Sequence, residues 1–272
     1  MPMKPGAYYR PTDIPKALDL LSHPDSVILA GGTKLLASEA GLDAAHVVDL
    51  QALTLNSVDL VEGVLSVGAT CTVAAFIAAL GQTFPADPAA GLLALAAHRA
   101  GPNTYRNAAT VGGTVGARLP DSELLAALLL FEAQLSLASL AGVTEMGLEA
   151  YLDADERPEG LITAVKFAWP DGRGAAERVA RTPADYPIVS IAAWRDPADQ
   201  FTLAATGLGP VPQRLSAAEA ALAGGIDDST IAEAAEAAAA ANIHAGDFRG
   251  DVSYRQEMAR VLTRRALSQL AA

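Results

Sequence analysis

Apolar positions in the first fifty residues change from a helical to a strand-like period. Four apolar residues recur at helical spacing within 12–22 and predict a short packing helix there: Ile14, Ala17, Leu18 and Leu21. Residues 27–30 and 46–50 are short apolar runs typical of buried strands. Good helix formers fill 34–40 between them. The pattern therefore predicts a small βαβ-like unit.

A second α/β unit follows, beginning with a β-hairpin. Residues 60–61 and 64–67 flank the two-residue turn Glu62-Gly63, which is a hairpin signal. Gly101-Pro102 interrupts the helical pattern further on. The remaining apolar segments predict helices over 73–80, 91–99 and 121–130, the last capped by Asp121 or Ser122, and strands over 135–138 and 161–169.

The breaker Pro170-Asp171-Gly172-Arg173-Gly174 predicts a domain boundary. Beyond it, 188–194 and 201–206 have the pattern of antiparallel strands. Helices are expected over 216–223, 228–241 and 252–270. The last is amphipathic and is expected to pack on its own domain, with Arg255, Arg260, Arg264 and Arg265 on its polar face.

Two glycine-rich segments, 30–33 and 110–114, suggest an anion site. Each is interpreted as a turn after an apolar, strand-like run. Glycine permits positive φ and leaves no Cβ between backbone amides and a ligand, so paired turns of this kind can bind one diphosphate. A hydrogen bond to a charged group contributes roughly 1.5–3 kcal/mol, more than the roughly 0.3–1 kcal/mol of an exposed helix dipole. The alternative is that each glycine pair is only a tight turn.

Composition restricts the partners. The 272 residues are about half apolar and suit one large domain or two ordinary ones. Lys and Arg number 19 against 31 Asp and Glu, and no basic tract offsets the net charge of −12. This balance argues against nucleic acid or an anionic membrane surface. An anionic cofactor must then be bound by local amides.

The chemistry-bearing side chains are sparse. Cys71 is the single cysteine, so an iron–sulfur cluster would have to lie on a partner; Cys71 is interpreted as a small buried residue in preference to a functional thiol. No catalytic triad, metal-ligand cluster or HExxH motif is evident. The four histidines are far apart along the chain and are interpreted as structural or surface residues: His23, His46, His98 and His244.

Nothing in the pattern predicts secretion or a membrane span. Residues 1–11 contain a lone Lys4 and no apolar stretch, which favours a cytoplasmic location. Polar residues interrupt the apolar tract 124–142, so it is interpreted as a buried helix followed by a strand.

Four blocks, in order along nearly the whole chain, resemble the FAD-binding medium subunit of the molybdenum hydroxylases, the xanthine dehydrogenase and carbon monoxide dehydrogenase family. They are AGGTKLL (30–36), RNAATVGGTVGARLPDSELLAALL (106–129), RTPADYPIVSIAA (181–193) and DFRGDVSYRQEMARVLTRRAL (247–267). The second and fourth are the most specific.

The resemblance implies an α+β fold: a two-subdomain PCMH-type FAD-binding fold, followed by a C-terminal three-stranded antiparallel sheet with helices. It places an FAD-binding domain at 1–170, with two α/β subdomains at about 1–55 and 56–170. A C-terminal flavoprotein domain would occupy 171–272.

The resemblance also implies which residues bind FAD. The diphosphate would be bound by amides of both glycine segments, the acidic residue at 123 would contact FAD, and 185–186 would lie near the flavin edge. The implied cofactor-binding residues are Ala30, Gly31, Gly32, Thr33, Lys34, Leu35, Thr110, Gly112, Gly113, Thr114, Glu123, Asp185 and Tyr186.

Several of these positions depart from the family pattern. Lys34 replaces an acidic or small residue, and we interpret it as pointing to solvent in preference to pairing with a phosphate. Thr114 and Glu123 replace an asparagine and an aspartate but keep hydrogen-bonding capacity. Arg118 is either a contact to phosphate or adenine or a surface cation.

The implied function is electron transfer without catalytic residues or a metal site in this chain. A molybdenum-cofactor large subunit and a [2Fe–2S] small subunit would form a heterotrimer with it, which is expected to dimerise, and FAD would pass electrons to an acceptor that the sequence leaves open. One alternative is a stand-alone FAD-dependent oxidoreductase of the vanillyl-alcohol-oxidase-like fold, although neither glycine segment has the flavin-linking histidine frequent in that group. Another is a scaffold subunit that has lost FAD.

Overall fold

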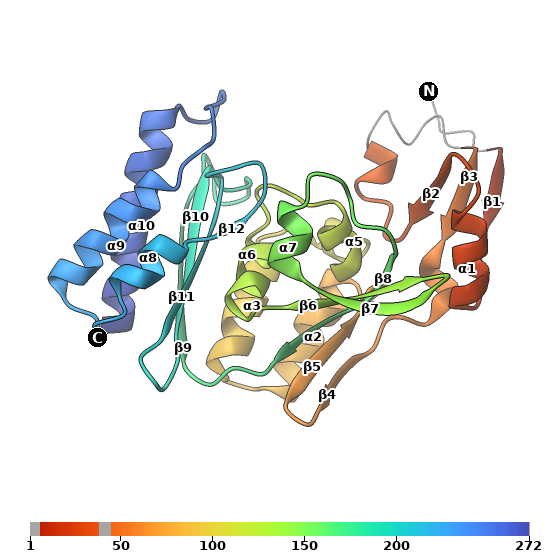
Figure 1. The fold of residues 1–272 in the computed structure, drawn as a ribbon, viewed down its shortest axis with the longest axis horizontal. Helices are drawn as coiled ribbons and strands as arrows, with labels where there is room; N and C mark the ends of the chain where they lie inside the picture. The colour runs from red at the N-terminus through yellow and green to blue at the C-terminus, as the bar shows by residue number, and fades with distance from the viewer. Residues whose placement is uncertain (1–5, 38–44, 272) are drawn as a thin grey trace.

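A computed structural model describes residues 6–37 and 45–271. Its elements form three successive groups along the long axis of the molecule (Figure 1). A small N-terminal sheet lies at one end, a larger sheet with helices lies in the middle, and a C-terminal sheet covered by helices lies at the other end.

The N-terminal sheet is parallel, with strand order β1-β3-β2. Its elements are β1 (Ala7–Tyr9), α1 (Ile14–Leu21), β2 (Ser26–Leu29), the 3₁₀ turn η1 (Leu35–Ala37), β3 (His46–Asp49) and the 3₁₀ turn η3 (Leu50–Leu53). The side chain of Asp13 caps α1 by accepting from the Lys16 amide. The βαβ-like interpretation missed β1. The predicted helix over 34–40 is present only as η1, and its residues 38–40 lie outside the described residues.

The middle sheet is antiparallel throughout, with order β4-β5-β8-β6-β7. Its strands are β4 (Val58–Val61), β5 (Val64–Gly68), β6 (Gln134–Ser139), β7 (Gly142–Gly147) and β8 (Leu161–Ala168). The predicted hairpin is confirmed, because Glu62 and Gly63 both have positive φ, 51° and 77°, as a two-residue hairpin turn requires.

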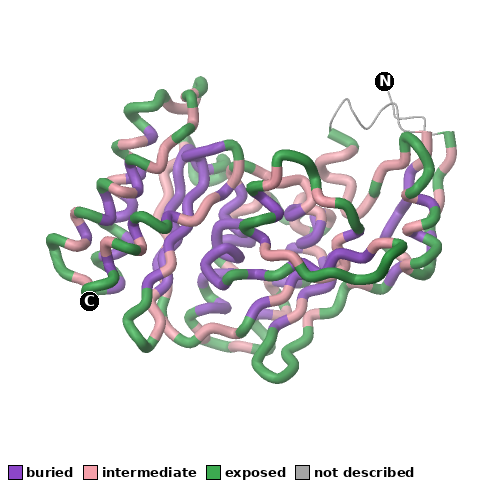
Figure 2. The backbone as a smooth tube through the Cα atoms, viewed as in Figure 1, coloured by how far each residue is buried: buried purple, intermediate pink, exposed green. Residues whose placement is uncertain are grey.

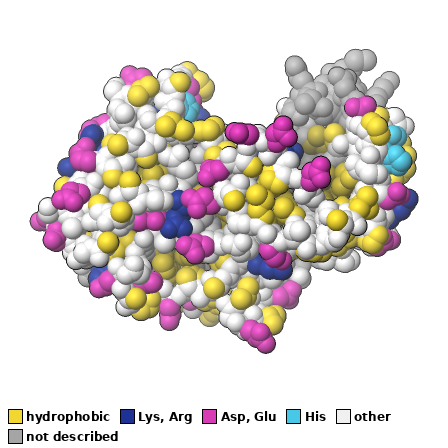
Figure 3. All heavy atoms as spheres, in the orientation of Figure 1, with side chains coloured by type: hydrophobic (Ala, Val, Ile, Leu, Met, Phe, Trp, Pro, Cys, Tyr) yellow, Lys and Arg dark blue, Asp and Glu magenta, His cyan; other side chains and the backbone are white. Residues whose placement is uncertain are grey.

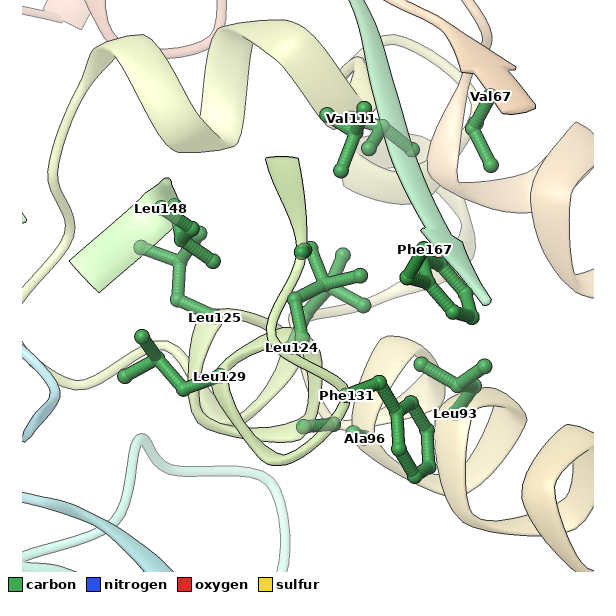
Figure 4. Packing of buried hydrophobic residues seen from close by; sticks show 14 of the residues in the cluster. Val67, Leu93, Ala96, Val111, Leu124, Leu125, Leu129, Phe131, Leu148 and Phe167 are labelled. Carbon is green, nitrogen blue, oxygen red and sulfur yellow. The ribbon is translucent and has the colours of Figure 1, made fainter. Parts of the chain in front are cut away.

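Six helices belong to this middle part: α2 (Val73–Thr83), α3 (Pro88–His98), α4 (Asn103–Arg106), α5 (Val111–Gly116), α6 (Glu123–Leu130) and α7 (Leu148–Asp153). Ser122 caps α6 by accepting from the Leu125 amide, as predicted. Every residue of α6 is buried, so this helix forms the centre of the largest core (Figure 2). Figure 4 shows Leu124, Leu125 and Leu129 of α6 packed among side chains of the neighbouring helices and strands.

The second glycine segment is not a turn after a strand, contrary to the sequence prediction. Short helix α4 precedes it, and Thr110 forms only an isolated bridge with Thr72. Gly112 and Gly113 instead lie in the first turn of α5, which Thr110 caps. The cap and the packing around the segment override the low helix propensity of glycine.

The C-terminal sheet has three long antiparallel strands and one of two residues, in the order β12-β11-β10-β9. They are β9 (Arg173–Val179), β10 (Val189–Arg195), β11 (Phe201–Thr206) and β12 (Gln213–Arg214). Alternate residues of β10 bury opposite faces: Ala192 and Trp194 join the core around α6, whereas Ile191 and Ala193 join the core under the C-terminal helices.

Those helices are α8 (Ser216–Ala221), α9 (Asp228–Ala240) and α10 (Val252–Ala271). As expected, α10 packs on β9, β10 and α9 (Figure 1). The prediction for Arg255 is wrong, because this side chain is fully buried on α10 instead of lying on its polar face. Its guanidinium donates to the carbonyl oxygens of Ile188 and Gly207, at 2.6 and 2.7 Å, and to Asp247 at 2.8 Å.

No helix in the described ranges is long and apolar enough to cross a membrane. Acidic side chains are scattered over the face drawn in Figure 3 and outnumber the basic ones there, in keeping with the net charge.

Candidate functional site

A cavity of about 520 Å³ lies between the loop after β2 and the start of α5. This volume is within the range of small-molecule and cofactor sites. Most of the predicted site residues line it: Ala30, Gly31, Gly32, Thr33, Lys34, Leu35, Thr110, Gly112, Gly113 and Thr114. Glu123, Asp185 and Tyr186 are outside this lining. Both glycine segments therefore face one space.

The first segment has the geometry of an anion-binding loop. Gly32 has a φ of +72°, which favours glycine. A Cβ on Gly31 would lie 1.9 Å from the carbonyl oxygen of Ala108, so only glycine lets this loop touch the chain before α5. Among the described residues, the amides of Gly31, Gly32 and Thr33 donate no hydrogen bond. These donors remain available to a ligand in the cavity.

The second segment differs from the first, because most of its amides are already used. Val111 and Gly112 donate to the carbonyl oxygens of Cys71 and Ala69, at 2.9 and 3.0 Å. Gly113 donates to the hydroxyl of Thr110 at 3.0 Å. A Cβ on Gly112 would come within 2.5 Å of Ala69. This pair of glycines therefore serves close packing. Among the described residues of the second segment, the amide of Thr110 alone donates no hydrogen bond, whereas the first segment offers a run of three.

Lys34 lies on the cavity, not in solvent as the sequence interpretation favoured. Its Nζ is 5.6 Å from the ring centroid of Tyr105 and 5.4 Å from that of Tyr186, which are cation–π distances. Tyr105 also lines the cavity, so Lys34 lies against an aromatic wall of this space. Burial raises the pKa of both tyrosines, so their hydroxyls stay protonated at neutral pH.

Glu123 is buried away from the cavity, unlike the implied FAD contact. Its two carboxylate oxygens are each 2.9 Å from an arginine nitrogen, Nη1 of Arg99 and Nη1 of Arg178. Asp185 is exposed, and its backbone carbonyl accepts from Arg178 at 2.8 Å. The carboxylate of Glu123 is thus engaged within the protein.

Sequence reasoning missed Tyr151 and Arg157, which both line the cavity. Arg157 is exposed and forms no ion pair within the described chain. Arg118 is neither a free surface cation nor part of the lining: it donates to the carbonyl oxygens of Leu152 and Ala154 and lies 5.9 Å from the Tyr151 ring centroid. The polar stretch around Arg157 gave no periodic signal from which its position could be inferred.

The remaining candidates are structural. Cys71 is fully buried, and burial raises the pKa of its thiol to about 11, so it is not a thiolate at neutral pH. His23 and His46 are distant in sequence but lie with ring centroids 5.8 Å apart, which corrects the view that all histidines are separate. Within the described ranges, no group of three or more His, Cys, Asp or Glu could hold a metal ion.

The cavity fits an anionic dinucleotide. Its lining combines unpaired amides, two cations (Lys34 and Arg157) and tyrosine and aliphatic surface, and it includes no carboxylate among the described residues. A diphosphate requires donors and positive charge, and flat rings require apolar or aromatic walls.

Comparison with known proteins agrees with this fit. A family model described as FAD binding domain in molybdopterin dehydrogenase matches residues 3–170, and one described as CO dehydrogenase flavoprotein C-terminal domain matches residues 175–270. The protein YgfM of Escherichia coli (strain K12), described as uncharacterized, is 28% identical over 261 residues, covering 94% of this chain and 92% of that protein.

Two solved structures have the same fold. Carbon monoxide dehydrogenase from Hydrogenophaga pseudoflava matches with a TM-score of 0.89 at 24% identity, covering 100% of this chain and 98% of that chain. Quinoline 2-oxidoreductase from Pseudomonas putida 86 matches with a TM-score of 0.87, also at 24% identity and with the same coverage.

Fold and site together define a flavoprotein subunit of the oxidoreductase class. The chain belongs to the family of FAD-binding subunits of the molybdopterin dehydrogenases, and its cofactor is FAD. The resemblance based on the four sequence blocks is confirmed, and a stand-alone flavin oxidoreductase is not favoured.

Proposed function

We propose that the cavity between the loop 30–35 and α5 is the FAD site and that this chain relays electrons between partner subunits and an acceptor. The observation that supports the site most directly is the unpaired amide run of Gly31, Gly32 and Thr33 beside Lys34. These amides would bind the diphosphate. Bound FAD would supply the redox chemistry, and the protein would contribute binding, orientation and electrostatics.

Two cations belong to the cavity lining, Lys34 and Arg157, and Lys34 lies close to the rings of Tyr105 and Tyr186. We propose that Arg157 contacts the adenosine-phosphate half of FAD. The part of the cavity near Tyr186 would hold the flavin half, because the resemblance places 185–186 near the flavin edge.

The partners follow from the chemistry that this chain lacks. It has a single, fully buried cysteine, so clusters that deliver single electrons must be held by another subunit. We propose a heterotrimer with a molybdenum-cofactor large subunit and a [2Fe–2S] small subunit, located in the cytoplasm. The domain division at 170–171 remains part of this proposal.

Titration of the purified full chain with FAD, FMN and riboflavin tests the site. A diphosphate site should bind FAD at least tenfold more tightly than FMN, and Arg157→Gln should reduce this preference. Lys166→Gln is the matched control, because Lys166 is a cation on β8 that pairs with Glu145 and does not line the cavity. Equal affinity for the three flavins would contradict the site.

Iron and molybdenum that co-elute with the native protein would support the heterotrimer, and their absence from the native complex would contradict it.

A further inference from the structure

A chain of contacts connects the buried carboxylate of Glu123 to Lys34 of the cavity lining. Glu123 lies at the start of α6, and Arg178 lies near the end of β9. Their side chains, only 7% and 11% exposed, are joined at 2.9 Å. The pair therefore links the middle part of the molecule to the C-terminal sheet.

The same arginine holds the loop between β9 and β10. Its Nη2 donates to the carbonyl oxygens of Pro183, at 3.0 Å, and Asp185, at 2.8 Å. Nη1 binds Glu123, so the planar guanidinium spans an anion on one side and two backbone carbonyls on the other. A lysine could not make this set of hydrogen bonds, because its ammonium group lacks the planar, forked arrangement of donors.

The loop carries Tyr186, which lies next to the cavity lining. Its ring centroid lies 5.4 Å from Nζ of Lys34, and Lys34 belongs to the cavity lining. Tyr186 itself is 36% exposed, so its position depends on the loop more than on burial. Without the hydrogen bonds from Arg178 to the two loop carbonyls, Tyr186 would no longer be held against Lys34.

We infer that Glu123 and Arg178 are positioning residues that act through Tyr186. They fix the loop 181–187 so that Tyr186 covers the end of the cavity where the flavin half of FAD is proposed to bind. This inference rests on the proposed FAD site. It gives the acidic residue at 123 an indirect role, through an arginine, in place of a direct contact with the cofactor.

Arg99 provides a matched control. Arg99 and Arg178 each make one 2.9 Å bond to Glu123, but only Arg178 bonds the loop. Arg99→Gln and Arg178→Gln therefore remove equivalent ion pairs and differ in the loop contact. The full chain, loaded with FAD, is compared by FAD titration and by iodide quenching of flavin fluorescence, which measures how far solvent reaches the flavin.

Arg178→Gln should raise the iodide quenching constant at least threefold and weaken FAD binding about tenfold, whereas Arg99→Gln should stay within twofold of the wild type in both. Arg178→Lys should restore little, because it lacks the fork. Equal behaviour of the two Gln variants would overturn the inference.

Should Arg178→Gln fail to fold, Tyr186→Ala replaces it: greater quenching supports the covering role, and unchanged quenching overturns it. If the wild type binds no FAD, the proposed site fails first and the inference with it.

Discussion

A glycine can serve a site either by the backbone conformation it permits or by the close contact it allows, and this chain uses both. Gly32 adopts positive φ in a loop whose amides face the cavity unpaired. Gly112 lets α5 approach Ala69, and its amide is used in that contact. The two segments look equivalent in the sequence because a glycine pair does not by itself indicate which of the two roles it has.

Replacement of Gly32 by alanine should weaken FAD binding about tenfold and destabilise the fold by about 1 kcal/mol. The positive φ is unfavourable for an L-residue, and the new Cβ would lie 3.0 Å from Cδ1 of Leu36. FAD titration and urea unfolding measure the two effects. Gly91→Ala is the control: its Cβ meets nothing within 4 Å in α3, so stability should rise by about 0.5–1 kcal/mol with FAD affinity unchanged. Parallel effects of the two variants would contradict the special role of Gly32.

Substitution of Lys34 by methionine should lower FAD affinity about fivefold and reduce its dependence on salt. Methionine keeps the apolar stem between the two tyrosine rings but removes the charge that faces an anionic ligand. The dissociation constant, measured at low and high ionic strength, gives both quantities. If the affinity of the variant for FAD and its salt dependence match those of the wild type, Lys34 does not interact with FAD and the solvent-facing interpretation holds.

At the scale of elements, hydrophobic patterning predicted the elements with clear apolar runs and missed those that are exposed or are stabilised by contacts with their neighbours. The fully buried α6, apolar after Glu123, and the hairpin β4–β5 were predictable. Strand β7 was missed because most of its residues are exposed at a sheet edge. Helix α5 was taken for a turn because its stability comes from tertiary hydrogen bonds of Val111 and Gly112, which leave no trace in local propensity. The cavity residues of the first loop were predictable, whereas Arg157 depended on the fold.

The start of α10 is stabilised by the ion pair of Arg255 with Asp247, although sequence periodicity placed Arg255 on the polar face of the helix. Burial alone would raise the pKa of Asp247, but hydrogen bonds from Arg255 and Arg249 outweigh it and hold the pKa below the ordinary value of 3.8. A lowered folded-state pKa stabilises the fold above about pH 4, and this contribution is lost as the pH falls further.

Asp247→Asn should therefore cost about 2 kcal/mol at pH 7, less than the 3–5 kcal/mol of a fully buried pair, since Asp247 is partly exposed. The difference from the wild type should shrink below pH 4. Urea unfolding across pH 3–8 measures it. Asp251→Asn is a nearby control, because its carboxylate caps the start of α10 and bonds no arginine in the described chain; its penalty should be smaller at pH 7. A penalty for Asp247→Asn that is constant down to pH 3 would contradict this account.

At the scale of the whole molecule, the cavity is built from segments of the N-terminal and middle sheets, and the loop beside it comes from the C-terminal sheet. A ligand that fills the cavity therefore contacts segments of both sheets at once and stabilises their arrangement in the folded state. Binding to the folded state alone stabilises it by about 2.7 kcal/mol at a ligand concentration 100 times the dissociation constant.

FAD at that excess should accordingly raise the melting temperature by about 5–10 °C, given about 2–4 °C per kcal/mol for a chain near this size. Differential scanning calorimetry measures it, with riboflavin, which lacks the diphosphate, as the matched ligand. A shift of equal size with riboflavin would indicate that the isoalloxazine ring alone accounts for binding.

Trp194 lies at the junction between the middle part and the C-terminal sheet, whereas Trp169 packs within the middle part. Trp194 meets Phe131 edge to face at 5.1 Å, and Trp169 stacks on Phe84 at 3.7 Å. The fluorescence contribution of Trp194 consequently reports on the packing of that junction. Its red shift would record the moment when the two sheets part, separately from events at the nucleotide.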